Sequence, residues 1–157
     1  MVSKKELLQI IADQQNLCFK PDDMPRLHSG FSDNEVTVIS GIRRCGKSTL
    51  LHEIRASNAE KDYYLNCDDE RLLNFRLEDF QLLYEVFLEL FGKQSTFYFD
   101  EIQNVSGWER FVRRLHDHKN KVFISGSNAS MLSRELGTHL TGRYLQQELF
   151  PFSFREF

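Results

Sequence analysis

Short apolar runs alternate with amphipathic segments along the chain, and the two kinds of segment predict different elements. Runs of β-branched and aromatic residues predict buried β-strands, which we expect at 36–40, 62–66, 95–100, 121–126 and 143–150. Apolar residues that recur three or four positions apart predict helices, which we expect at 4–16, 47–58, 77–91, 107–118 and 129–136. Because strands and helices alternate, the pattern predicts a three-layer α/β fold whose five-stranded sheet is mostly parallel and covered on both faces.

The two ends of the chain depart from this regular alternation. Ser3 is a suitable N-cap for the first helix, and Glu6, three positions later, completes a capping box. Residues 17–34 contain two prolines with several Asp and Ser residues, which predicts a surface connection. We therefore divide the chain into an N-terminal helix and connection over 1–34 and a core over 35–157. The final Pro-Phe-Ser-Phe-Arg-Glu-Phe ends abruptly, which predicts that the core is the C-terminally truncated part of a longer protein.

A glycine-bounded loop joins the first strand of the sheet to the helix that follows it. Residues 41–48 read Gly-Ile-Arg-Arg-Cys-Gly-Lys-Ser and fit the Walker A pattern G-x-x-x-x-G-K-[ST] at every fixed position. Glycines let backbone N–H groups turn toward phosphate oxygens, and the helix directs its partial positive charge at the same place. An ordinary glycine turn that enters a helix is the weaker alternative. The residues expected to contact a nucleotide are Gly41, Arg44, Cys45, Gly46, Lys47, Ser48 and Thr49.

Basic, hydroxyl and acidic side chains divide the expected chemistry of this site between them. Lys47 is expected to reach the β and γ phosphates and to take part in catalysis, and Ser48 carries a hydroxyl suited to Mg²⁺. Asp100 and Glu101 follow the third predicted strand and form the acidic, Walker B half of the site. Asp100 is expected to hold a water on the metal, and Glu101 to orient and deprotonate the water that attacks the γ-phosphate. The alternative is a solvated acidic turn after a strand.

The order of these segments indicates the class of nucleotide. A strand at 62–66 lies between the loop-bearing and acid-bearing strands, and a glutamate follows the acid. Both features are similar to P-loop ATPases that carry a catalytic glutamate. The sequence has no NKxD-type segment for reading guanine, so ATP is favoured over GTP.

Several segments together resemble one bacterial and archaeal group of AAA+ ATPases over about residues 20–157. They are GIRRCGKSTLL, FYFDEIQNVSGWERFVRRLHD, FISGSNASMLSREL, LTGRY and LFPFSFREF. The resemblance implies an AAA+-like P-loop core with the strand order 5-1-4-3-2. It also implies a C-terminal region after this core, sometimes of nuclease-like or DNA-associated character.

The resemblance implies further site residues near the γ-phosphate. Ser127 and Asn128 occupy the polar sensor position, where the Asn128 amide can bond both the attacking water and phosphate, although both residues are also preferred helix N-caps. Arg143 matches the position of an arginine finger, which commonly acts across a subunit boundary and so implies a homo-oligomer. Arg134 is the competing candidate, and a surface salt bridge explains either arginine equally well.

Composition limits the partners and the location. Of 157 residues, 41% are hydrophobic and 27% are charged, values typical of one globular domain. The formal charge of -3 and the pI near 6.0 lack the basic excess of a dedicated DNA-binding domain, so any DNA contact is expected to be local. Three widely spaced cysteines without a CxxC pair, and no apolar stretch approaching 18 residues, predict a cytoplasmic protein without membrane contact.

These residues predict Mg²⁺-dependent ATP binding and hydrolysis, with the nucleotide state coupled to a C-terminal domain or a partner. The alternative is a slowly hydrolysing switch whose nucleotide-bound state recruits DNA or protein. A small-molecule kinase shares the loop but needs a lid and an acceptor pocket for which the sequence offers no residues. Multiple turnover of ATP separates the first hypothesis from the second.

Overall fold

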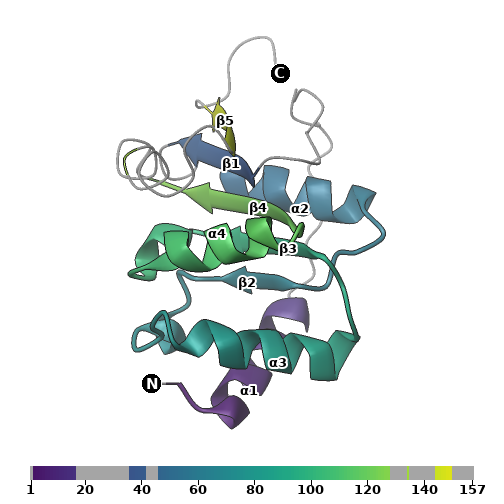
Figure 1. The fold of residues 1–157 in the computed structure, drawn as a ribbon, viewed down its shortest axis with the longest axis vertical. Helices are drawn as coiled ribbons and strands as arrows, with labels where there is room; N and C mark the ends of the chain where they lie inside the picture. The colour runs from purple at the N-terminus through teal and green to yellow at the C-terminus, as the bar shows by residue number, and fades with distance from the viewer. Residues whose placement is uncertain (1, 17–35, 42–45, 128–133, 135–143, 150–157) are drawn as a thin grey trace.

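The computed structural model describes residues 2–16, 36–41, 46–127, 134 and 144–149 of the chain (Figure 1). The helices in this part are α1 (Lys4–Asn16), α2 (Lys47–Ser57), α3 (Asp79–Phe91) and α4 (Trp108–Asp117). The strands are β1 (Val36–Gly41), β2 (Tyr64–Asn66), β3 (Thr96–Asp100), β4 (Lys121–Gly126) and β5 (Tyr144–Leu149). The short 3₁₀ helices η1 (Glu70–Leu72) and η2 (Ile102–Asn104) follow β2 and β3.

The strands form one parallel sheet in the order β2-β3-β4-β1-β5. Read from the other edge, this is the predicted order 5-1-4-3-2, and the predicted α/β fold is confirmed. In Figure 1 the strands follow one another from β5 at the top to β2, with α3 and α1 beyond β2. Because the strands are parallel, their carboxyl ends meet at one edge of the sheet, which is where ligands bind in open α/β folds.

Different helices cover the two faces of the sheet, because successive residues of a strand point to opposite faces. On one face, Val38 and Phe99 belong to a buried cluster that includes side chains of α1, α3 and α4. On the other face, Ile39 and Tyr98 pack with Ile54 of α2. Every residue of β1 and β3 is buried, as expected for strands that are covered on both sides.

Aromatic side chains fill the layer between the sheet and the helices α3 and α4. The rings of Phe80 and Phe111 stack with their centroids 4.2 Å apart. Each of these rings meets Phe99 of β3 edge to face at 6.0 Å. An aromatic pair contributes about 1 kcal/mol beyond the area it buries. The packing supports β3 directly before its last residue, Asp100.

The helix α1 begins as predicted and packs against the β2 side of the fold. The N–H of Glu6 donates to Ser3 Oγ at 3.2 Å, which confirms the predicted N-cap. Leu7, Ile10 and Ile11 of α1 are fully buried or nearly so and belong to the larger core cluster. The apolar stripe of this helix is therefore covered by α3 and by the sheet.

Some element boundaries differ from the predicted ones by a few residues. β2 begins at Tyr64, two residues later than predicted, because the Tyr64 N–H donates to the Asp62 carbonyl in a turn. α3 also begins two residues late, because the Asp79 carboxylate accepts the N–H of Arg76 and closes a turn there. The helix predicted at 129–136 lies outside the described residues except for 134.

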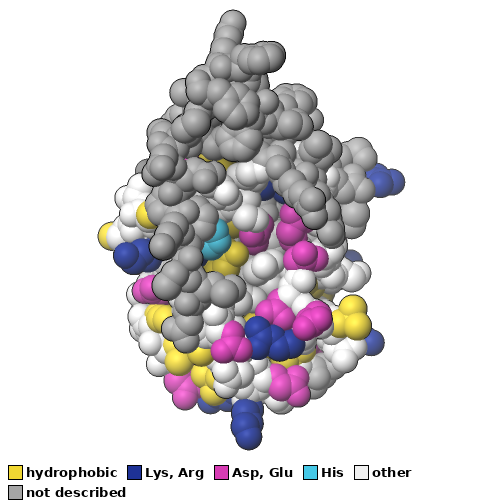
Figure 2. Space-filling view, turned by 180° about the vertical axis from the view of Figure 1, so that it is seen from behind, with side chains coloured by type: hydrophobic (Ala, Val, Ile, Leu, Met, Phe, Trp, Pro, Cys, Tyr) yellow, Lys and Arg dark blue, Asp and Glu magenta, His cyan; other side chains and the backbone are white. Residues whose placement is uncertain are grey.

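Charged side chains of both signs are mixed on the surface. Figure 2 shows acidic side chains beside basic ones across the described part of the rear face, in keeping with the formal charge of -3. Within the described part of the chain, no helix is long and apolar enough to cross a membrane. The division of the chain at residue 34 and the cytoplasmic location stay predictions.

Candidate functional site

The carboxyl ends of three strands bring the predicted site residues together. β1 leads toward α2, which begins with Lys47 and Ser48. β3 ends at Asp100, directly before Glu101, and β4 ends one residue before Ser127. Since β4 lies between β1 and β3 in the sheet, side chains from three separate parts of the chain converge at this edge.

Glycines occupy the two strained backbone positions that flank the predicted loop. Gly41 ends β1 with φ 155°, and Gly46 is the N-cap of α2 with φ 94° and ψ 17°. Gly46 lies in the left-handed region, where a Cβ atom is disfavoured. The Leu50 N–H donates to the Gly46 carbonyl at 2.9 Å, so helical bonding starts at this residue. The first N–H groups of such a helix have no partner within the helix and suit an anion.

Asp100 is the buried acid of the site, with 2% of its surface exposed. Its Oδ2 accepts from the Ser48 hydroxyl at 2.7 Å and from the Tyr64 hydroxyl at 3.3 Å, while its Oδ1 accepts from Ser125. Burial raises the pKa of Asp100 above its ordinary value, although the bonds from Ser125 and Ser48 act in the opposite direction. A cation beside Ser48 would offset this cost of burial, because it favours the charged carboxylate.

Glu101 turns its side chain toward the start of α2. Its backbone has φ 53° and ψ 48°, which is uncommon for a residue other than glycine and costs on the order of 1 kcal/mol. Its carboxylate lies 3.5 Å from Lys47 Nζ and accepts from the Ser127 hydroxyl at 2.7 and 2.8 Å. The Lys47 side chain is only 4% exposed, so the two charges meet in a largely desolvated place.

The surroundings of Glu101 keep its carboxylate ionised. Burial acts to raise the pKa of Glu101, but hydrogen bonds from Gln103 and Ser127 and the charge of Lys47 outweigh burial. The net effect is a pKa below the ordinary glutamate value. An ionised carboxylate at this edge can accept a proton from a water that is bound beside it.

Ser125 bridges the two acids and was not identified from the sequence. This residue of β4 is fully buried, donates its hydroxyl to Asp100 and accepts the N–H of Glu101 at 3.0 Å. The Ser125 side chain therefore bonds both the Asp100 carboxylate and the strained backbone of Glu101. A serine directly after the apolar run at 122–124, within the predicted strand, was the available sequence signal.

Tyr64, whose hydroxyl donates to Asp100, is a second residue of the site that was not identified from the sequence. The Arg55 guanidinium lies 4.2 Å over the Tyr64 ring, and the His52 ring packs against it at 4.9 Å. Burial, together with the charge of Arg55, lowers the pKa of His52 to about 4, so this imidazole is neutral at neutral pH. Burial raises the pKa of Tyr64, which keeps its hydroxyl a hydrogen-bond donor.

The remaining predicted residues are only partly described. Thr49 lies in the first turn of α2, and Arg134 is exposed. Asp69 is the N-cap of η1 and accepts the Arg71 N–H at 3.0 Å. The predicted site residues outside the described part of the chain are Arg44, Cys45, Asn128 and Arg143.

The fold and the residues at the carboxyl ends of its strands define a P-loop ATPase domain of the AAA type. A family model described as "AAA domain" matches residues 33–157. The chain therefore belongs to the AAA domain family, which implies nucleotide binding, and the predicted relationship to AAA+ ATPases is confirmed.

Curated relatives extend well beyond this chain. "Uncharacterized protein MJ1544" of Methanocaldococcus jannaschii is 38% identical over 160 residues, which cover 100% of this chain and 36% of that protein. An "Uncharacterized protein" of Haemophilus influenzae is 38% identical over 136 residues, covering 81% of this chain and 34% of that protein. The chain thus spans about a third of the length of these relatives.

A solved structure is similar in its overall fold. The Aeropyrum pernix Orc1 protein in complex with DNA aligns with a TM-score of 0.46 and 11% identity. The alignment covers 98% of this chain and 45% of that chain. A likeness of this degree is too distant to transfer a ligand or a partner.

Proposed function

We propose that this domain binds ATP with Mg²⁺ and hydrolyses it. The observation that carries the proposal is the convergence of two pairs at one edge of the sheet. Ser48 Oγ lies 2.7 Å from Asp100, and Lys47 Nζ lies 3.5 Å from Glu101. The first pair offers oxygen ligands to a hard cation, and the second places a cation and a base where the terminal phosphate would lie.

Nucleotide binding depends on the start of α2. The N–H groups that follow Gly46 are suited to donate to phosphate oxygens, and Lys47 contributes a positive charge to the β and γ phosphates. Because Lys47 already faces Glu101, phosphate binding exchanges part of this ion pair for a contact with the nucleotide. The other residues proposed to contact ATP are Gly41, Arg44, Cys45, Ser48 and Thr49.

The residues at this edge fit a magnesium ion that is shared with the nucleotide. Among the residues that the structure describes, no group of three or more His, Cys, Asp or Glu side chains is placed to hold a metal ion alone. Mg²⁺ commonly uses only one or two protein oxygens together with phosphates and water, so Ser48 and Asp100 suffice. When bound, the ion neutralises charge on the phosphates.

Glu101 is the proposed base for hydrolysis. It orients the attacking water and accepts its proton, while Ser127 donates to the carboxylate and limits its rotation. Asn128, the next residue, is proposed to bond the water and the γ-phosphate. The alternative of a slowly hydrolysing switch is also compatible with these contacts, because Lys47 and Ser127 engage the Glu101 carboxylate that would accept the proton.

An arginine from a second copy is proposed to complete the site. Arg143, or Arg134 in its place, would stabilise negative charge on the transferred phosphoryl group across a subunit boundary. The homo-oligomer would then couple the nucleotide state to a C-terminal region or to a partner. Local contact with DNA stays a proposal of the same kind.

Steady-state phosphate release tests the proposal. We expect multiple turnovers with Mg²⁺ and ATP, none with excess EDTA, and a specific activity that rises with protein concentration because the finger acts in trans. Assays with and without DNA identify whether DNA stimulates turnover. Tight ATP binding with no more than a single turnover would instead support the switch.

A further inference from the structure

β2 is an edge strand of only three residues, and a glutamine of α1 bonds the open side of its last residue. Asn66, the last residue of β2, donates its N–H to Gln14 Oε1 at 2.9 Å. Its carbonyl accepts from Gln14 Nε2 at 3.2 Å. The amide of Gln14 therefore satisfies both backbone groups of Asn66, as a neighbouring strand would.

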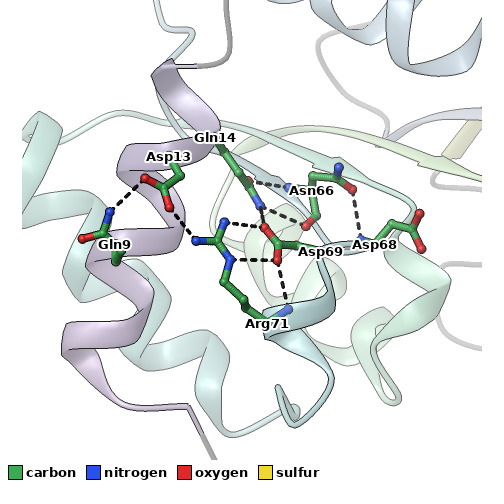
Figure 3. Close-up of polar contacts among 7 residues, drawn as sticks. All are labelled: Gln9, Asp13, Gln14, Asn66, Asp68, Asp69 and Arg71. Atoms are coloured by element: carbon green, nitrogen blue, oxygen red, sulfur yellow. Dashed lines mark hydrogen bonds and ion pairs between the residues drawn. The ribbon is translucent and has the colours of Figure 1, made fainter.

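Charged side chains hold Gln14 in this position (Figure 3). Gln14 Nε2 also lies 3.2 Å from Asp69 Oδ2, and Asp69 accepts two bonds from the Arg71 guanidinium at 2.8 and 3.0 Å. Arg71 reaches Asp13, the neighbour of Gln14 on α1, at 2.5 Å. Gln9 in turn donates to Asp13 at 2.8 Å. The end of α1 and the turn after β2 are thus joined by one continuous network.

The backbone of the same turn contacts Asp100. Asn66 lies opposite Asp100 in the register of β2 with β3, and the N–H of Cys67 donates to the Asp100 carbonyl at 2.8 Å. Asp100 thus receives support from β2 on the side opposite to Ser125. Because the Asp100 carbonyl is the acceptor of the Cys67 N–H, a shift of Asn66 and Cys67 would also displace Asp100, the last residue of β3.

A second connection runs from the turn to Glu101. The Asn104 side chain donates to Asp68 Oδ1 at 3.2 Å, and the Asp68 N–H donates to the Asn66 side chain at 3.0 Å. The Asn104 N–H donates to the Glu101 carbonyl at 3.2 Å. Glu101 has a left-handed backbone that neighbouring contacts must maintain, and this connection is one of them.

We propose that Gln14 is a positioning residue for ATP hydrolysis. The helix α1 therefore contributes to catalysis, although it precedes the family match at 33–157. Gln14 acts on Asp100 and Glu101 through Asn66 and the turn that follows it. The inference rests on the proposed function. Only 8% of Gln14 is exposed. Burying a flexible polar side chain costs conformational entropy and hydration, and the hydrogen bonds of Gln14 offset this cost.

Gln14→Met in the full chain tests the inference, because methionine keeps the length and helix propensity of glutamine and removes its hydrogen bonds. We expect kcat for ATP to fall about tenfold, since small displacements of reacting groups cost one to two orders of magnitude. KM for ATP and the affinity for a fluorescent ADP analogue should stay within about twofold of wild type, because the hydrogen bonds of Gln14 in the described part of the chain reach Asn66 and Asp69.

Two further variants separate positioning from stability. Asn104→Ala removes the exposed end of the second connection and should lower kcat in the same selective way, even if Gln14→Met fails to fold. Lys4→Ala, the matched control, breaks the 2.9 Å ion pair between α1 and Glu89 of α3 and should leave kcat unchanged.

The outcomes distinguish this inference from the proposed function. A wild-type kcat in folded Gln14→Met, or in Asn104→Ala where Gln14→Met does not fold, overturns the inference and leaves the proposed function intact. Equal losses of kcat and of ADP affinity also overturn it, because they indicate a general loss of structure. Absence of turnover in the wild-type chain overturns the proposed function and, with it, this inference.

Discussion

Ser48 and Asp100 are 52 positions apart in the chain, and the Ser48 hydroxyl donates to the Asp100 carboxylate at 2.7 Å. The contact joins the start of α2 to the end of β3. It places two side-chain oxygens next to each other at the carboxyl ends of the strands, where α2 begins. The pair is the part of the site that the proposed magnesium ion would use.

Ser48→Ala should weaken the magnesium dependence of nucleotide binding. We expect the Mg²⁺ concentration for half-maximal binding of a fluorescent ADP analogue to rise about tenfold, because one oxygen ligand is lost. Ser57→Ala, which changes a hydroxyl at the other end of the same helix, is the control and should show the wild-type Mg²⁺ requirement. Identical Mg²⁺ titrations for Ser48→Ala and wild type would argue against a metal at this pair.

Ser125→Ala should lower both the stability and the activity, although it removes only one hydroxyl group. It removes a donor to buried Asp100 and the acceptor of the Glu101 N–H at 3.0 Å, leaving two polar groups without this partner. We expect the free energy of unfolding to fall by about 1–3 kcal/mol, as for other buried groups left unsatisfied, and kcat to fall with it. Urea denaturation and phosphate release measure the two effects. A variant as stable and active as wild type would contradict the bridging role.

Lys47→Ala should strongly weaken ATP binding. The lysine supplies the charge for the phosphates, and its loss also leaves Glu101 without its 3.5 Å partner in a half-buried place. Equilibrium binding of fluorescent ATP should weaken at least about 100-fold, which corresponds to the loss of a charge-assisted contact of about 3 kcal/mol. Lys61→Ala replaces an exposed lysine and serves as the control. Retained affinity in Lys47→Ala would place the phosphates elsewhere.

The network at Asp69 makes part of the stability depend on acid pH. Hydrogen bonds from Arg71 lower the pKa of Asp69 from 3.8 to about 2. A carboxyl group with a lowered pKa contributes stability above its unfolded pKa, and the contribution is lost as pH falls through the folded value. Asp69→Asn should therefore be less stable than wild type at pH 7, with the difference shrinking between about pH 4 and pH 2. Thermal unfolding across this range measures the difference, and a pH-independent gap would refute the assignment.

Local sequence pattern predicted the elements and the two halves of the site. The glycine-bounded loop, Lys47, Ser48 and the acids at 100 and 101 stand in motifs whose spacing is set by one strand and one helix. The strand order followed from the family resemblance and is confirmed by the sheet.

Contacts between distant segments could not be predicted in the same way. The partners of Asp100 include Tyr64 and Ser125, which come from two other strands and meet it only because of the sheet register. The hydrogen bonds of Gln14 with Asn66 span 52 positions and depend on where α1 docks. Periodicity identifies the buried face of a helix, but it does not identify which open strand edge a polar residue on that face will meet.

The proton-accepting role of Glu101 is the central claim, and one comparison tests it most directly. ATP affinity and steady-state phosphate release are measured for the wild-type chain and for Glu101→Gln, which keeps the shape of the side chain and removes its basicity. We expect ATP affinity within about threefold of wild type and turnover lowered at least about 100-fold, as for loss of a general base. Equal turnover in the two proteins would contradict the account.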